Sequence, residues 1–189
     1  MKLTRLGIEG AWLAESLVWN DDRGFFLEWF KRDEVLVKTG FDFSVKQANI
    51  SLSNKGVIRG IHYSLAVGGQ AKWVSCLSGS IVDVVIDIRP GSPTYKKVEY
   101  FELKAGDGKA LLIGPGLGHG FIALKDKTVI SYLLTTEYSP ELEFGILPTD
   151  TELDIDWHLN SLDGMNPVLS EKDAGAPTLE ARKLEGKLP

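Results

Sequence analysis

Apolar and polar residues alternate over most of the chain between residues 44 and 136, in short runs separated by Gly, Ser and Asn. Alternation with a period of two is typical of β-strands, whose successive side chains point to opposite faces. In the run "IVDVVIDI" (81–88), every second residue from position 82 is Val or Ile, and these residues share one face. Asp83 and Asp87 fall on the other face with two further apolar residues. Many strands at regular spacing, with Gly-rich turns between them, predict an all-β sandwich or barrel.

Three segments carry the signals of turns between these strands. "LSGS" separates two strong apolar runs and predicts a tight hairpin turn at Ser78 and Gly79. "GFIALKDKTVISYLLTTEY" predicts another strand pair, which turns at residues 125–127. "RPGSPT" (89–94) is a further turn, because Gly and Pro interrupt regular structure. The first two segments therefore predict strands that pair with their neighbours in the chain.

Only two helices are predicted, one over residues 32–39 that ends at a glycine and one over residues 177–185 after "AGAP". We expect a single domain over residues 1–189, with a barrel core at about 44–140 and a Pro- and Asp-rich segment at about 141–189 that wraps the barrel. The predicted fold is thus an all-β barrel with a short N-terminal helix and a C-terminal helical tail. Because a small barrel can hold one ligand in its interior, the inward-facing polar residues are the candidates for function.

Composition narrows the function classes. The 189 residues are 43% apolar and 25% charged, which is ordinary for a globular protein, and the formal net charge of −5 disfavours general nucleic-acid binding. No apolar run approaches the ~20 residues of a membrane span, and the N-terminus lacks the long apolar region of a secretion signal. Cys76 is the only cysteine, so no intrachain disulfide can form. We therefore expect a cytoplasmic protein that binds neither membrane nor nucleic acid.

The stretch "RGIHYSLAVGGQAKW" (59–73) brings Arg59, His62 and Lys72 into an otherwise strand-like run. His62 can be read as a general base, since imidazole titrates near neutral pH, or as a structural histidine that is hydrogen-bonded in the core. On a regular strand Arg59 and His62 point to opposite faces. They could share one cavity only if Gly60 marks a bulge that turns a side chain around.

The glycine-dense loop "GPGLGHGF" (114–121) ends in His119 and resembles the second motif of cupin barrels. Its glycines allow close approach of the backbone to a ligand or tight packing, and a simple turn is the structural alternative. In metal cupins this histidine is a ligand, together with an upstream His-x-His pair and a carboxylate. Here "HYS" (62–64) offers only one histidine, and the chain contains three in all. We therefore expect no metal site.

Two other segments combine aromatic and ionisable side chains. "SYLLTTEYSPELE" (131–143) contains Tyr132, and a tyrosine at the end of a barrel strand can donate a proton, although most tyrosines pack and hydrogen-bond. "DDRGFFLEWF" (21–30) sets Arg23 and Glu28 beside four aromatic residues. Arginine suits phosphate, and aromatic faces suit a base or a sugar ring. An edge strand with a salt bridge is the structural alternative for this segment.

Taken together, these segments resemble the dTDP-4-dehydrorhamnose 3,5-epimerase family of cupin-type jelly rolls, which act on nucleotide-linked 4-keto sugars. The resemblance covers most of residues 20–177 in the family's order. It is carried by "DDRGFFLEWF", "KQANISLSNKGVIRGIHY", "QAKWVSCLSGSIVDVVIDIRPGSPT", "GPGLGHGF", "YLLTTEYSPELE", "LDIDW" and "LSEKDAGAP". The combination of "RGIHY", "QAK" and the Asp–Arg–GSPT turn is far more specific than any single motif.

The resemblance implies four catalytic residues. His62 would be the base, and Asp173 of "SEKD" would orient its imidazole. Tyr132 would be the acid on the opposite face of the sugar, and Lys72 would lie near the C4 oxygen. A C–H group beside a ketone is acidic because its carbanion delocalises onto that oxygen, where an ammonium stabilises the enolate. Since the substrate already holds the ketone, the resemblance implies neither a redox cofactor nor a metal.

The resemblance also implies substrate-binding residues and a partner. Arg59 and Arg23 would hold the pyrophosphate, with Arg23 supplied by the second subunit of a homodimer with strand exchange. Further positions that match pocket-lining residues of such enzymes are Phe26, Glu28, Gln47, Asn49, His119, Tyr138 and Glu143. The substrate would be a dTDP-linked 4-keto sugar of rhamnose or another deoxysugar pathway.

Two departures from the family pattern leave open which sugar carbons are inverted. Ser64 stands where Gln is common after "HY", and "LAVGG" (65–69) replaces a loop that usually contains proline. The alternatives are therefore an epimerase that acts on C3 or C5 alone, a non-catalytic sugar-binding cupin, and a metal-dependent cupin oxygenase or isomerase. The acid and base set disfavours the non-catalytic alternative, and the missing His-x-His pair disfavours the metal-dependent one.

Overall fold

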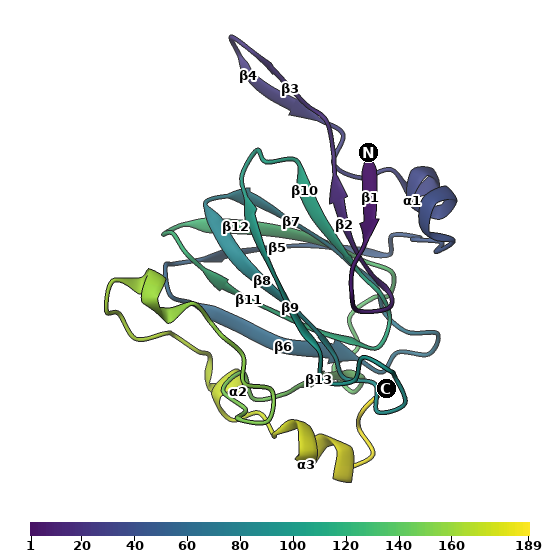
Figure 1. Ribbon diagram of the computed structural model, residues 1–189, viewed down its shortest axis with the longest axis vertical. Coiled ribbons are helices and arrows are strands. Elements are labelled where there is room, and N and C mark those ends of the chain that lie inside the picture. The colour runs from purple at the N-terminus through teal and green to yellow at the C-terminus, as the bar shows by residue number, and fades with distance from the viewer.

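The computed structural model describes residues 1–189 and consists mainly of two antiparallel β-sheets (Figure 1). The larger sheet has six strands, in the order β1 (Lys2–Arg5), β2 (Ala11–Glu15), β10 (Lys109–Ile113), β7 (Lys72–Ser78), β12 (Thr128–Leu134) and β5 (Gln47–Ser53). The smaller sheet has five, in the order β13 (Glu143–Gly145), β6 (Ile58–Ser64), β11 (Leu117–Ala123), β8 (Ser80–Asp87) and β9 (Val98–Lys104). The two sheets pack face to face, which confirms the predicted all-β jelly roll.

The N-terminal part of the chain adds strands outside the predicted core range of about 44–140. Strands β1 and β2 extend the six-stranded sheet beyond β10. Strands β3 (Val18–Asp21) and β4 (Gly24–Leu27) pair only with each other. Figure 1 shows this hairpin projecting away from both sheets. Its side chains therefore have few partners within this chain.

Both predicted helices are confirmed, and two shorter helical segments were missed. Helix α1 (Arg32–Thr39) ends at Gly40 in the left-handed conformation, and α3 covers Leu179–Leu184. The missed segments are α2 (Glu171–Ala174) and a 3₁₀ turn at Leu159–Leu162. One turn of helix is too short to produce a hydrophobic period. None of these helices has both the length and the apolar composition that a membrane crossing requires.

The two hairpins predicted at Ser78–Gly79 and at residues 125–127 are wrong. Strand β7 pairs with β10 and β12, whereas β8 pairs with β11 and β9, so Gly79 carries the chain from one sheet to the other. Residues 125–127 make the same kind of crossing between β11 and β12. A turn signal in the sequence indicates a change of direction but not the pairing partner. Because the chain crosses, Val74 of β7 and Val85 of β8 contribute to one buried cluster from the two different sheets.

The apolar residues form three buried clusters, one between the sheets and one on the outer face of each. The cluster between the sheets includes Val74 and Phe121. On the outer face of the six-stranded sheet, Trp73 packs with Val35 of α1. On the outer face of the five-stranded sheet, the C-terminal segment supplies Trp157 to a third cluster. The apolar face predicted for residues 82–88 lies in this third cluster, because the C-terminal segment covers that side of β8.

A bulge at Gly60 answers the question of whether Arg59 and His62 can share a cavity. In the β6–β11 ladder His62 lies opposite His119, and Arg59 lies opposite Phe121. The two pairs are three residues apart on β6 but only two residues apart on β11, so β6 contains one extra residue. Gly60 has a φ of +117°, and a Cβ there would be 2.6 Å from the Cα of Gly120. The extra residue reverses the alternation between Arg59 and His62. Both side chains therefore reach the space between the sheets.

We expect Gly60→Ala to lower the free energy of unfolding by about 2–5 kcal/mol, because the new methyl group adds both overpacking and backbone strain. Urea denaturation of the variant and the wild-type protein measures the change. Gly68→Ala is the matched control, since Gly68 also has a positive φ, of +79°, but a Cβ there meets nothing within 4 Å. The control is expected to cost about 1–2 kcal/mol. Equal losses in the two variants would contradict the close contact between β6 and β11.

Candidate active site

A cavity of about 250 Å³ opens between the two sheets. The predicted site residues that line it are Asn49, Arg59, His62, Lys72, His119, Tyr132, Tyr138 and Glu143. They come from strands β5, β6, β7, β11, β12 and β13 and from the loop before β13. Side chains that are up to 94 residues apart in the sequence, such as Asn49 and Glu143, thus meet around one space.

The ionisable residues are divided between the two walls of this cavity. His62 and His119 stand directly opposite each other on β6 and β11 of the five-stranded sheet. Lys72 and Tyr132 belong to β7 and β12, which are neighbours in the six-stranded sheet. A ligand between the sheets would therefore have imidazole groups on one side and the ammonium and phenol groups on the other.

His62 is paired with Asp173 of α2, as expected from the sequence. The His62 Nε2 atom lies 2.7 Å from Asp173 Oδ1. The Ser170 hydroxyl caps α2 by accepting a hydrogen bond from the Asp173 amide. Burial by itself would raise the pKa of Asp173, but hydrogen bonds from His62, Ser170 and the Gly60 amide hold that pKa below its usual value. Asp173 is therefore an ionised partner that orients the ring of His62 through Nε2. The other ring nitrogen, Nδ1, is not used in this pair.

Lys72 places an ammonium group in a buried position. Lys72 is 8% exposed, and its Nζ donates a hydrogen bond to the backbone carbonyl of His62 at 3.2 Å. Burial lowers the pKa of Lys72 to about 8, while the charges of Glu143 and Asp83 oppose this change. A cation in such a low-dielectric position stabilises a developing anion more than a solvated lysine can.

His119 forms a second histidine–carboxylate pair, with Asp83 of β8. Its Nε2 atom lies 2.8 Å from Asp83 Oδ2, and both side chains are buried. Burial raises the pKa of Asp83, and the nearby His119 and Lys72 oppose the increase. The sequence placed Asp83 on the face of its strand opposite Val82 and Val84, but it did not indicate this pairing. No group of three or more His, Cys, Asp or Glu side chains is arranged to hold a metal ion.

Polar residues at one end of the cavity are held by hydrogen bonds from neighbouring strands. Arg59 Nε donates to Ser53 Oγ at 3.0 Å, and this bond extends the guanidinium along β5. Gln47 Nε2 donates to Asn49 Oδ1 at 2.9 Å, and Gln47 Oε1 accepts from the Tyr138 amide at 2.7 Å. Gln47 does not itself line the cavity, so its observed contacts position Asn49 and the loop that carries Tyr138.

Several cavity residues were missed in the sequence, and two of them are informative. Gln70 donates to Glu143 Oε1 at 3.0 Å, which fixes the carboxylate beside Lys72. Lys172 lines the cavity from α2, next to Asp173. The other missed lining residues are Ser51, Phe121, Ile130, Leu134 and Phe144. The signal for Lys172 was its place in "SEKD", but only the helix turns its side chain toward the cavity.

Gln47 and Asp173 do not line the cavity but are hydrogen-bonded to residues that do, whereas three further predicted residues lie away from the cavity of the same chain. Arg23, Phe26 and Glu28 lie on or next to the β3–β4 hairpin, where all three are exposed. The guanidinium of Arg23 is bound to Asp21 of the same hairpin. The side chain of Phe26 is 65% exposed.

With this geometry in view, comparison with known proteins assigns the family. The family model for dTDP-4-dehydrorhamnose 3,5-epimerase matches residues 5–181. The chain belongs to this family. The match includes both sheets, the cavity and α2, so the resemblance expected from the motifs is confirmed over nearly the whole chain.

The similar members of the family differ in the reaction that their names give. A dTDP-4-dehydrorhamnose 3,5-epimerase of Mycobacterium tuberculosis is 41% identical over 100% of this chain and 93% of its own length. A dTDP-4-dehydrorhamnose 3-epimerase of Streptomyces niveus is 40% identical over 100% of this chain and 89% of its own length. The structure of an epimerase from Legionella pneumophila in complex with dTDP-4-keto-L-rhamnose matches with a TM-score of 0.91 at 36% identity, covering 100% of this chain and 97% of that one.

For this epimerase-family chain, we expect Asp173→Asn to lower the free energy of unfolding by about 1–3 kcal/mol at pH 7, because a buried charge-assisted hydrogen bond is weakened. The pKa of Asp173 is lower in the folded chain than in the unfolded one, so its ionised form stabilises the fold above about pH 4. The difference between variant and wild type should therefore shrink as the pH falls below 4. Urea denaturation from pH 7 to pH 3 measures it.

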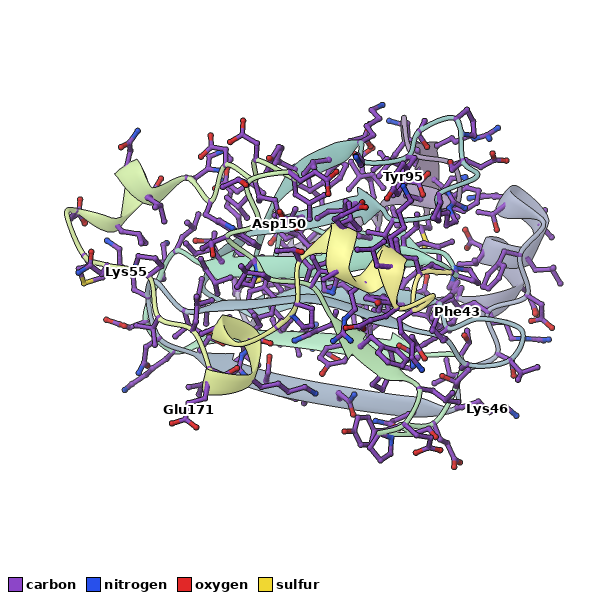
Figure 2. All side chains as sticks on the ribbon, turned by 90° about the horizontal axis from the view of Figure 1, so that it is seen from below. Phe43, Lys46, Lys55, Tyr95, Asp150 and Glu171 are labelled. Atoms are coloured by element: carbon purple, nitrogen blue, oxygen red, sulfur yellow. The ribbon has the colours of Figure 1, made fainter.

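Glu171→Gln provides the control for this series. Glu171 is on the same helix, and Figure 2 shows its side chain directed away from the molecule. We expect its loss to change stability by no more than about 0.5 kcal/mol at any of these pH values. An Asp173→Asn effect that persists unchanged at pH 3 would contradict an ionised Asp173.

Proposed function

We propose that this chain inverts C3 and C5 of a dTDP-linked 4-keto-6-deoxyhexose, the reaction of a dTDP-4-dehydrorhamnose 3,5-epimerase. The observation that carries the proposal is the position of two different proton-transfer groups on opposite walls of one cavity. His62, paired with Asp173, is on the five-stranded sheet, and Tyr132 is on the six-stranded sheet. Inversion requires this arrangement, because the proton must leave one face of the carbon and return on the other.

The proposed reaction begins when His62 removes the proton from a carbon next to the C4 ketone. The electron pair of the broken C–H bond moves into a C–C double bond, and the carbonyl electrons move onto the C4 oxygen. The buried ammonium of Lys72 stabilises this enolate oxygen. Tyr132 then donates its phenolic proton to the opposite face of the carbon, and the ketone re-forms. His62 returns its proton to solvent and Tyr132 takes one back, so no atom is oxidised or reduced.

The other cavity residues support binding of a nucleotide sugar. Arg59 and Lys172 offer two cations for a pyrophosphate, and arginine suits phosphate oxygens by its forked geometry. His119 and Glu143 can hydrogen-bond sugar hydroxyl groups. Tyr138 is 59% exposed at the edge of the cavity, where its ring can stack on a nucleotide base. Asn49, positioned by Gln47, offers amide groups to that base.

Inversion at C3 alone is the second candidate function. It is favoured by the 3-epimerase of Streptomyces niveus, which is 40% identical to this chain, against 41% for the 3,5-epimerase of Mycobacterium tuberculosis. The loop at residues 65–69 also favours this candidate, because it lies next to Gln70 of the cavity and departs from the family pattern.

We also propose that two copies of this chain form a dimer in which each β3–β4 hairpin completes the cavity of the other. The hairpin has three exposed aromatic residues, Trp19, Phe25 and Phe26, which are 45%, 55% and 65% exposed. Strand β5 is the edge of the six-stranded sheet and exposes Ile50 beside the cavity residue Asn49. A partner hairpin on this edge would cover these apolar groups and bring Arg23 and Glu28 to the substrate. The cytoplasmic location stays a prediction.

Incubation with dTDP-4-keto-6-deoxyglucose in D₂O tests the reaction. We expect deuterium at both C3 and C5, measured by mass spectrometry and proton NMR. His62→Ala should lower the exchange rate by ~10²–10⁴-fold, because the base is removed, while dTDP affinity changes little. Label at C3 alone would select the 3-epimerase, and label at neither carbon would overturn the proposed function.

Subunit mixing tests the dimer. Arg23→Ala and His62→Ala homodimers should each be weakly active, because every cavity lacks one group. After the two variants are mixed and exchanged, the hybrid dimer should regain up to half of the wild-type activity per dimer. One of its two cavities then combines His62 of one chain with the partner's Arg23. Mixing each variant with itself is the control, and no recovery in a hybrid that is verified by native mass spectrometry would refute the shared cavity.

A further inference from the structure

Asp83 is a buried carboxylate next to the cavity residue His119, and the proposed reaction leaves it without a role. Its side chain is 0% exposed, and it does not itself line the cavity. The Oδ2 atom of Asp83 is hydrogen-bonded to Nε2 of His119, whereas its Oδ1 atom has no hydrogen-bond partner. A buried carboxylate normally has partners on both oxygens, because an unbonded charge in a dry interior is costly. The half-bonded state of Asp83 therefore calls for a function.

Comparison with Asp173 shows what is unusual about Asp83. Each carboxylate is paired with one cavity histidine, at 2.7 Å for Asp173 and 2.8 Å for Asp83. The Ser170 hydroxyl and the Gly60 amide also act on the carboxylate of Asp173 and lower its pKa, whereas the only such groups around Asp83 are His119 and Lys72. Burial raises the pKa of Asp83, and His119 and Lys72 are the two groups that oppose this and favour its charged form. Asp83 shares a face of β8 with Ile81 and Val85, which lie in the cluster between the sheets. Lys72 faces the same space between the sheets, where the charges of Asp83 and Lys72 act on each other.

Lys72 needs such a counter-charge. Burial disfavours its ammonium form and lowers its pKa to about 8. The other titratable groups around this part of the cavity are mostly basic: Arg59 and His62 on β6, His119 on β11, and Lys172 on α2. Tyr132 on β12 is neutral when it acts as an acid, and Glu143 on β13 is the one acidic residue that lines the cavity. Asp83 on β8, which is buried and does not line the cavity, adds a second negative charge.

We propose that Asp83 is a positioning residue of the epimerase reaction, which keeps Lys72 in its ammonium form and fixes the ring of His119 toward the sugar. Lys72 must carry its proton when the enolate forms, because a neutral amine would not stabilise the C4 oxygen. The carboxylate of Asp83 favours the positive charge of Lys72 through the protein interior, without touching the substrate. The same carboxylate holds Nε2 of His119, so that its other ring nitrogen, Nδ1, remains for a sugar hydroxyl.

This inference rests on the proposed function, and its first test is the pH profile of the reaction in Asp83→Asn. Activity should fall at alkaline pH as Lys72 loses its proton, and removal of the Asp83 charge should move this loss to lower pH. Relative to wild type, kcat/KM of the variant should decline by about threefold or more between pH 6.5 and pH 9, which corresponds to a shift of about half a pH unit. A misfolded or distorted site would lower kcat/KM equally at all pH values.

A second measurement does not depend on turnover. The rate at which acetic anhydride acetylates Lys72, followed by peptide mass spectrometry from pH 6 to pH 10, reports the fraction of neutral amine. We expect a midpoint near about 8 in the wild-type chain and a lower midpoint in Asp83→Asn and in Asp83→Ser. The shorter serine leaves space rather than adding bulk, so it provides a second folded variant. If wild type exchanges no deuterium but its Lys72 midpoint still depends on Asp83, the proposed function fails and the charge relation stands.

Asp87→Asn is the matched control. Asp87 lies on the same strand and is also 0% exposed, but Arg89, Ser92 and Thr94 donate to its carboxylate. Its loss should lower the melting temperature and leave both the alkaline limb of kcat/KM and the Lys72 midpoint in place. If Asp83→Asn and Asp83→Ser are folded and keep the wild-type midpoint, or if Asp87→Asn shifts it equally, Asp83 does not set the charge of Lys72 and the proposal is wrong.

Discussion

The close contact of two backbones at Gly60 and Gly120 is the constraint on which the site depends. No side chain fits between β6 and β11 there, because a Cβ on Gly60 would be 2.6 Å from the neighbouring Cα. The resulting bulge breaks the alternation along β6 and directs both Arg59 and His62 into the cavity. It also brings the Gly60 amide to Asp173, so a single irregularity positions the proposed base and its partner carboxylate.

Charge balance is the second organising feature. The cavity walls carry more basic than acidic side chains, and the carboxylates Asp83 and Asp173 are each paired with one cavity histidine. Such an arrangement favours a diphosphate and a developing enolate, both of which are anionic. It also keeps the acidic groups from repelling them. The low exposure of Lys72 makes its charge sensitive to Glu143 and Asp83, which links strand β8 to the proposed stabilisation of the C4 oxygen.

Sequence patterns predicted the strands well but not how they pair. Alternation assigned β8 correctly, and its two faces do lie in different clusters. The turn at Gly79 was predicted in the right place, yet it joins the two sheets rather than two paired strands. Helix α2 was missed because one turn shows no period, although it carries Asp173 and Lys172. Family motifs supplied what periodicity could not, since Asp173 is 111 residues from His62 in the chain.

The sequence by itself determined the fold class, the family and the residue types available for the reaction, because alternation and motif order are local properties of the chain. Only the tertiary structure decided which of those residues meet. The Gly60 bulge, the crossings between the sheets and the pairing of Asp83 with His119 arise from contacts between segments far apart in the chain. The position of Arg23 shows the same limit, because its exposed hairpin lies outside the cavity of its own chain. Packing and the burial of charge depend on neighbours in space, and no local pattern specifies those neighbours.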